Sequence, residues 1–149
     1  MLLPTRRSGI LAGVSRPEYY GKPGRVEGDL EVVRAIYDAF ARRDLDDALA
    51  HLSDDFELHV EGTARETGRA APYRRHDGMR EYLADVGRVW DSLELHAEDF
   101  RAVPGSVIVI GHVTAVRAGE SLERAVVWTW RLRGGKAVHL RVADLGELR

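Results

Sequence analysis

The sequence contains no cysteine among its 149 residues. Without thiols the chain can form no disulfide bond, no thiolate metal site and no cysteine nucleophile. It also lacks an apolar run approaching the roughly 20 residues that a helix needs to cross a bilayer, so we predict no membrane insertion. The charges nearly cancel, leaving a formal net charge of −2, which gives no electrostatic reason to expect nucleic acid as a partner.

Recognisable cofactor motifs and targeting signals are also missing. We find no P-loop and no dinucleotide fingerprint, which argues against nucleotide cofactors, and no G-x-S-x-G motif of a serine nucleophile. Residues 1–28 are rich in Gly, Pro and Arg without hydrophobic periodicity, and we interpret them as an irregular arm before one domain at 29–149. The apolar stretch GILAGV is too short for the core of a signal peptide, so we predict a cytoplasmic protein.

Helical periodicity begins near Asp29 and recurs in three segments. Asp29 and Asp44 are expected to cap the first two helices, because aspartate accepts hydrogen bonds from free amides at a helix start. A wide apolar stripe between residues 77 and 90 predicts the third helix. The stripe of the first helix consists of Val33, Ile36, Tyr37 and Phe40.

Alternation typical of strands dominates the rest of the sequence. It appears at 54–62 and again in four segments, 93–103, 106–116, 124–132 and 136–144, which are joined by short turns. The apolar positions near His96 fall out of phase, which indicates a β-bulge. We therefore predict an α+β fold, with three N-terminal helices on a curved antiparallel sheet that forms a cone-shaped barrel. The wide end of such a cone is the natural place for a pocket.

Four stretches together carry a family resemblance. RDLDDALAHLSDDFELHV, YRRHDGMREYL, EDFRAVPGSVIVIGHV and VVWTWRLRGGKAVHLRV resemble the SnoaL-like branch of the nuclear transport factor 2-like superfamily, to which ketosteroid isomerase and polyketide cyclases are related. The resemblance implies a cone-shaped pocket for a hydrophobic small molecule, no metal or organic cofactor, and a homodimer. It does not imply one reaction, because such proteins include isomerases, cyclases, epoxide hydrolases, dehydratases and silent binding domains.

The resemblance also shows which catalytic groups are missing. By the family pattern, the isomerase base falls on Val60, the oxyanion tyrosine on Ile36 and the protonated aspartate on Trp128. The last-strand aspartate of the cyclases and epoxide hydrolases falls on Val142. Since none of these side chains transfers a proton, we expect none of those mechanisms in unchanged form.

Three other residues are candidates for proton transfer. Asp144 shares strand parity with Val142, so it either points into the cone or ends the strand as a solvated carboxylate. Tyr37 lies on the apolar stripe of the first helix, one position from the missing tyrosine. His96 lies at the predicted bulge. We predict a catalytic role for them in the order Asp144, Tyr37, His96.

The candidate substrate-binding set is apolar and aromatic. Trp128 and Trp130 lie two residues apart on one strand, so they share a face, and buried indole N–H groups need partners that a ligand could supply. The alternative is that they fill the core. The predicted substrate-binding residues are Trp128, Trp130, Tyr82, Leu58, Val60 and Val142.

Histidine spacing gives little support for a metal. His59 is flanked by Glu57 and Glu61, but no H-x-H or H-E-x-x-H pattern accompanies it, so we predict no metal site. His112 faces either the pocket or a dimer partner, depending on register, and the family pattern places it outward.

Two hypotheses of different classes remain at this point. The first is a cofactor-independent enzyme, an isomerase, cyclase or dehydratase, that acts on an apolar ring-containing metabolite. The second is a non-catalytic domain of the same fold that binds a small molecule or dimerises. The loss of the family carboxylates is what the second hypothesis expects.

Overall fold

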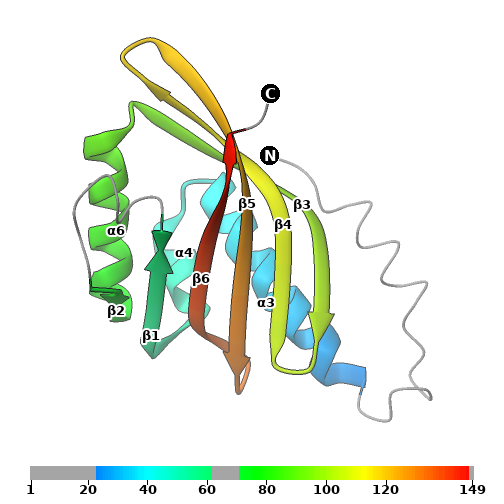
Figure 1. Ribbon diagram of the computed structural model, residues 1–149. Coiled ribbons are helices and arrows are strands. Elements are labelled where there is room, and N and C mark those ends of the chain that lie inside the picture. Colours follow the sequence, from blue (N-terminus) through cyan, green and yellow to red (C-terminus); the bar gives the residue numbers. More distant parts are fainter. Residues whose placement is uncertain (1–22, 62–70, 148–149) are drawn as a thin grey trace.

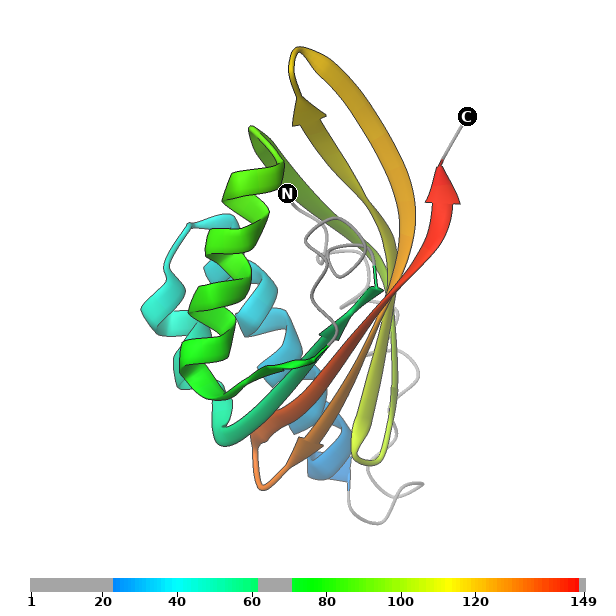
Figure 2. The same cartoon turned by 60° about the vertical axis from the view of Figure 1, so that its left-hand side comes forward.

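The computed structural model describes residues 23–61 and 71–147. Residues 1–22 of the predicted arm lie outside these ranges, so the prediction of an irregular arm is untested for them. Figures 1 and 2 show the described chain as a layer of helices against a curved sheet.

Three helices are present in the described residues: α3 (Pro23–Ala41), α4 (Leu45–Ala50) and α6 (Arg75–Val89). The prediction that Asp29 caps the first helix is wrong, because α3 begins at Pro23 and Asp29 is buried inside it. Its carboxylate accepts a hydrogen bond from the Gly105 amide at 3.2 Å, which fastens α3 to a strand turn. Asp44 caps α4 as predicted and accepts from the Asp47 amide at 3.1 Å.

The described strands form one six-stranded sheet with the order β2-β1-β6-β5-β4-β3. Their bounds are β1 (Leu52–Val60), β2 (Tyr73–Arg74), β3 (Ser92–Val103), β4 (Ser106–Arg117), β5 (Glu120–Arg133) and β6 (Lys136–Glu147). The α+β class is confirmed, but the purely antiparallel sheet is wrong: β1 and β6 pair in parallel. Within the described residues the sheet is open, with β2 and β3 at its edges.

The helices cover one face of the sheet, which we call the inner face, and the opposite face is the outer face (Figure 2). The upper parts of β4 and β5 curve past the end of the helix layer in that view. None of the described helices combines the length and apolarity needed to span a membrane.

The core lies between α3 and the inner face. Alternate residues of every long strand point into it, as the predicted period-two pattern requires. Those that are almost completely buried include Phe56, Leu58, Val107, Val109, Trp130 and Ala137, together with Val33 and Ile36 of α3.

A β-bulge interrupts the pairing of β3 with β4, as the phase break near His96 predicts. The register shifts between Ala97 and Asp99. At this point Gly111 of β4 comes so close to β3 that a Cβ atom would lie 1.9 Å from the His96 carbonyl oxygen. Only glycine fits this approach, so the bulge and Gly111 belong together.

Candidate functional site

A cavity of about 460 Å³ lies beside the helix layer, at the end of α3 and α6 and the start of β3. Its apolar wall resembles the walls of small-molecule sites, which are largely hydrophobic and aromatic. The apolar side chains of the wall come from Phe40, Leu45, Tyr82, Leu83, Val86, Trp90, Leu93 and Leu95.

Two carboxylates on the rim of this cavity already serve the fold. Asp44 caps α4 and pairs with Arg42 at 3.2 Å. Asp91 accepts a hydrogen bond from the Ala118 amide at 3.0 Å. Trp90 carries the guanidinium of Arg117 over its ring, 4.6 Å from the centroid. These contacts shape the rim of the cavity.

An aromatic cluster lies between α3 and the inner face. Tyr37 makes edge-to-face contacts with Phe100, Trp128 and Trp130, with ring centroids 5.6–5.9 Å apart. The indole N–H of Trp130 donates to the Tyr37 hydroxyl at 3.2 Å. The partner of this indole is therefore a phenol of the core, and Trp128 and Trp130 are only 4% and 1% exposed.

The Tyr37 hydroxyl is held in its protonated form. Burial raises the pKa of Tyr37 well above its ordinary value, and the hydrogen bond from Trp130 opposes this rise only in part. The proximity of Tyr82 raises the pKa further. At neutral pH this phenol is a proton donor, and it cannot serve as a base.

Asp144 points to the inner face and is paired. Its backbone pairs with that of Val126 in β5, and the Val126 side chain points to the same face of the sheet as Trp128. The carboxylate accepts from the Arg124 guanidinium at 2.7 Å and from the Gly146 amide at 2.9 Å. The side chains of Asp144 and Arg124 are 11% and 29% exposed. Asp144 is thus neither solvated nor part of the wall of the described cavity.

His96 lies on the outer face. Its ring stacks on the ring of His112 with centroids 4.3 Å apart, and its Nε2 lies 3.2 Å from the Thr114 hydroxyl. His112 in turn lies near Glu98 and Glu123. The structure brings Asp144 and Tyr37 to one face of the sheet and places His96 on the other.

The other predicted binding residues divide between cavity and core. Tyr82 lines the cavity. Leu58 and Val60 of β1 are buried core residues, and Val142 packs against the same core cluster. These three and the two tryptophans form the inner face, and the cavity wall is built from the ends of the helices and from β3.

Sequence reasoning missed several residues of this region. Arg124 was not singled out, although it occupies an inward position in the alternation that leads to Val126 and Trp128. A charged residue at an inward position is the signal that identifies it. Trp90 and Phe40 appeared only as members of apolar stripes, and periodicity cannot distinguish a stripe that packs from one that borders a cavity.

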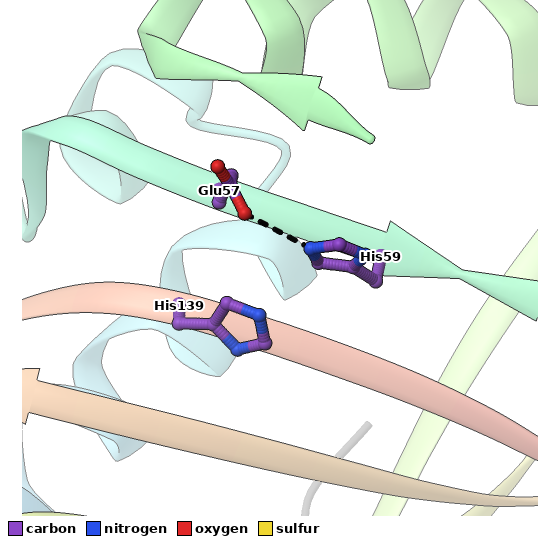
Figure 3. Close-up of side chains that lie close together, drawn as sticks. All are labelled: Glu57, His59 and His139. Carbon is purple, nitrogen blue, oxygen red and sulfur yellow. Dashed lines mark hydrogen bonds and ion pairs between the residues drawn. The ribbon is translucent and has the colours of Figure 1, made fainter. Parts of the chain in front are cut away.

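Another polar cluster lies on the outer face, where Glu57, His59 and His139 meet (Figure 3). The Glu57 carboxylate lies 3.0 Å from Nε2 of His59, and this hydrogen bond lowers the pKa of Glu57. Burial, and then the charge of His59, lower the pKa of His139. Of the residues that the structure describes, these three form the group able to hold a metal ion.

Comparison with known proteins places the chain in a family. The model of the family described as SnoaL-like domain matches residues 33–140. A search of curated protein sequences gave no significant match.

Solved structures agree on the fold. An NTF2-like protein of unknown function from Burkholderia pseudomallei K96243 has 24% identity and a TM-score of 0.73, covering 78% of this chain and 90% of that chain. TerC, co-crystallised with polyporic acid, has 24% identity and a TM-score of 0.73, with 78% and 91% covered. An LEH-like epoxide hydrolase of M. tuberculosis has 15% identity and a TM-score of 0.64, with 80% and 84% covered.

Proposed function

The chain belongs to the SnoaL-like domain family, and from this premise we propose that it is a cofactor-independent enzyme that moves protons on an apolar, ring-containing small molecule. The observation that carries the proposal is the Arg124–Asp144 pair on the inner face, with a 2.7 Å hydrogen bond and an Asp144 side chain that is only 11% exposed. Carboxylates are rarely buried to this extent without a reason in structure or chemistry.

The proposed chemistry uses one base and one acid. The Arg124 guanidinium donates to the Asp144 carboxylate at 2.7 Å and fixes its orientation. In the proposal this carboxylate accepts a proton from the bound ring. The buried, protonated Tyr37 donates toward the oxygen on which negative charge develops. Return of the proton from Asp144 to another carbon gives an isomer, and its transfer to a departing hydroxyl gives dehydration with release of water. In a cyclisation the carbanion left by deprotonation attacks a carbonyl carbon of the same molecule, and the proton from Asp144 goes to the alkoxide that this attack forms. Each of these outcomes balances without a cofactor.

The proposed ligand follows from the cavity wall. Phe40, Tyr82 and Trp90 supply aromatic surface in a space of about 460 Å³, which suits a compound of a few fused or linked rings. TerC was co-crystallised with polyporic acid, which makes that compound a reasonable first probe here. In the proposal the ring lies against Tyr82 of the cavity wall, which is near enough to Tyr37 to raise its pKa slightly.

A second candidate is a non-catalytic domain that binds the same class of ligand. It is favoured by the structural use of two of the carboxylates that line the cavity, because Asp44 caps α4 and Asp91 accepts a hydrogen bond from the Ala118 amide. It is also favoured by the position of Asp144, which is outside the described cavity wall.

A two-step experiment separates the candidates. A thermal-shift screen of polyporic acid, steroids and polycyclic aromatics finds a ligand, because a compound that binds only the folded state raises the midpoint. Mass spectrometry then follows the conversion of that ligand by the wild type and by Asp144→Asn. We expect a loss of turnover by roughly 10²–10⁴-fold with binding retained. Asp55→Asn, at an exposed carboxylate on the outer face, is the control and keeps full activity. Unchanged turnover in Asp144→Asn removes Asp144 from the mechanism, and no turnover in the wild type favours the second candidate.

The cavity itself is tested at Gly87 of α6. A Cβ atom at this glycine meets no atom within 4 Å, and Gly87 is one of the residues that line the cavity. Gly87→Leu is therefore expected to abolish the thermal shift produced by the ligand without unfolding the protein. The matched control is Gly28→Leu, because Gly28 of α3 also has nothing within 4 Å and lies outside the cavity wall.

We also propose a homodimer through the outer face. Val103, Ile108 and Ile110 of β3 and β4 are large apolar residues with 54%, 37% and 39% exposure. Apolar clusters of this kind mark interaction surfaces. Sedimentation of the wild type against Ile110→Lys tests this: dissociation by the substitution supports it, and a monomeric wild type ends it. The cytoplasmic location and the absence of a nucleic-acid partner stay predictions.

A further inference from the structure

The outer face carries a polar cluster that the proposed chemistry does not use. It is formed by Glu57 and His59 of β1 and His139 of β6. The two strands are parallel neighbours in which Glu57 pairs with His139, and His59 pairs with the position two residues beyond His139. Because alternate residues of a strand share a face, all three side chains leave the sheet on the same side and meet there (Figure 3).

The geometry of the cluster is close to that of a metal site. One ligand atom from each of the three residues lies within 4.8 Å of the others, and the Glu57 carboxylate and His59 Nε2 are 3.0 Å apart. The rings of His59 and His139 have centroids 4.9 Å apart with a tilt of 33°. Ligand atoms about 2.0–2.2 Å from a tetrahedral zinc ion lie roughly 3.4 Å from each other. Small side-chain rotations therefore suffice to bring the three atoms to that spacing.

The surroundings hold the carboxylate and leave an approach from solvent. The second oxygen of Glu57 is bonded by Arg74 of β2, which orients the carboxylate as an outer-shell partner does in metal sites. The side chains of His59 and Glu57 are 38% and 30% exposed, so an ion can enter and a water molecule can occupy a fourth position.

The donor set selects among metals. Two imidazoles and one carboxylate suit zinc and its first-row neighbours, whereas Ca²⁺ and Mg²⁺ require mostly oxygen ligands. Two cationic side chains, Arg131 and Arg141, lie close to His139, and their charge disfavours the binding of a weakly coordinated metal ion. Arg141 is also paired with Glu61, at 3.7 Å. Only a metal ion that these ligands coordinate strongly, such as a transition metal ion, is expected to bind against this repulsion.

We propose that Glu57, His59 and His139 bind one first-row divalent transition metal ion, with Zn²⁺ as the reference ion and a fourth position open to water. The bound ion ties β1 to β6, the parallel pair whose register shifts between Leu52 and Glu57. The site lies across the sheet from Asp144 and Tyr37, so it acts on the stability of the sheet and takes no part in proton transfer.

Calorimetric titration of the metal-stripped protein with ZnCl₂ tests the site. We expect one equivalent of Zn²⁺ to bind and to raise the midpoint of thermal unfolding, while MgCl₂ and CaCl₂ at the same concentration do neither. His139→Asn removes one of the three ligands. Loss of an outer-shell partner lowers metal affinity by up to about 100-fold, so we expect this loss of a direct ligand to lower zinc affinity by at least that factor. Glu57→Gln is the second variant, so that a folding defect in one of them still leaves a test.

The matched control is His112→Asn. His112 also lies on the outer face and stacks on a histidine, but it belongs to the other pair, with His96. Zinc affinity unchanged in His112→Asn and lost in His139→Asn supports the site. Equal affinity in the wild type and His139→Asn overturns it, as does binding that is lost in His112→Asn alone. Histidine side-chain nitrogen shifts measured by NMR on addition of Zn²⁺ identify the ligands independently, and shifts confined to His96 and His112 overturn the assignment as well.

Discussion

The two faces of the sheet are built from the same strands and differ in almost every physical property. The inner face is apolar and aromatic, and Trp130, Trp128 and Phe100 surround Tyr37 there. The outer face carries two histidine groups and several exposed ion pairs. Successive side chains of a strand alternate between the two faces, so apolar and polar residues alternate along each strand with a period of two.

The inner face supplies most of the stability of the fold, whereas residues of the outer face are freer to vary. Burial of large apolar side chains on the inner face dominates the free energy of unfolding. The outer face contributes less per residue, so it is where binding groups can be placed at small cost to stability. The Arg124–Asp144 pair is the exception, because it places charge on the inner face.

The strongest test of this contrast replaces a large side chain on each face. Trp130→Ala removes a fully buried indole that packs on Tyr37 and donates to its hydroxyl, so we expect a loss of about 3–5 kcal/mol in the free energy of unfolding. Leu145→Ala, at a position of β6 that is 62% exposed and lies outside the proposed dimer surface, is the control, with an expected loss below about 1 kcal/mol. Urea denaturation measures both. Similar losses for the two variants contradict the contrast between the faces.

Most of the fold was predictable because this contrast is visible in the sequence. Alternation in β5, where Thr129 and Arg131 separate the apolar residues Trp128, Trp130 and Leu132, predicts the strand and its buried face together. The bulge near His96 was predictable from the phase break. The parallel pairing of β1 with β6 was not, because alternation fixes which face a residue joins and says nothing about which strand lies beside it.

The same limit explains what sequence reasoning could not see in the sites. His59 and His139 are 80 positions apart by their residue numbers, and they meet only because β1 and β6 are neighbours. The prediction against a metal considered His59 with residues on its own strand. Parity left Asp144 either on the inner face or at the end of the strand as a solvated carboxylate. It did not reveal the partner Arg124, which comes from β5 across a register shift.

A second test concerns the bulge in the pairing of β3 with β4. Gly111→Ala places a Cβ atom 1.9 Å from the His96 carbonyl oxygen, which is backbone and cannot rotate away. We expect a loss of about 1–3 kcal/mol in the free energy of unfolding. Gly28→Ala in α3 has no atom within 4 Å of the new methyl group, and we expect it to stabilise the protein by up to about 1 kcal/mol. If urea denaturation gives the two variants the same sign, the tight approach of β3 and β4 is refuted.

The finest test compares one ion pair from each face by double-mutant cycles. The inner pair, Arg124 and Asp144, has a 2.7 Å hydrogen bond between side chains that are 29% and 11% exposed. The outer pair, Arg133 and Asp55, has a 3.2 Å contact between side chains that are 68% and 69% exposed. Partial burial reduces screening by water, so we expect a coupling free energy of about 1–2 kcal/mol for Arg124→Gln with Asp144→Asn, retained at high salt. For Arg133→Gln with Asp55→Asn, water and salt screen the charges, and we expect no measurable coupling. Urea denaturation at low and high salt measures both cycles. A coupling for the inner pair that is lost at high salt would mean that Asp144 is open to solvent, and it would remove the buried carboxylate on which the proposed proton transfer depends.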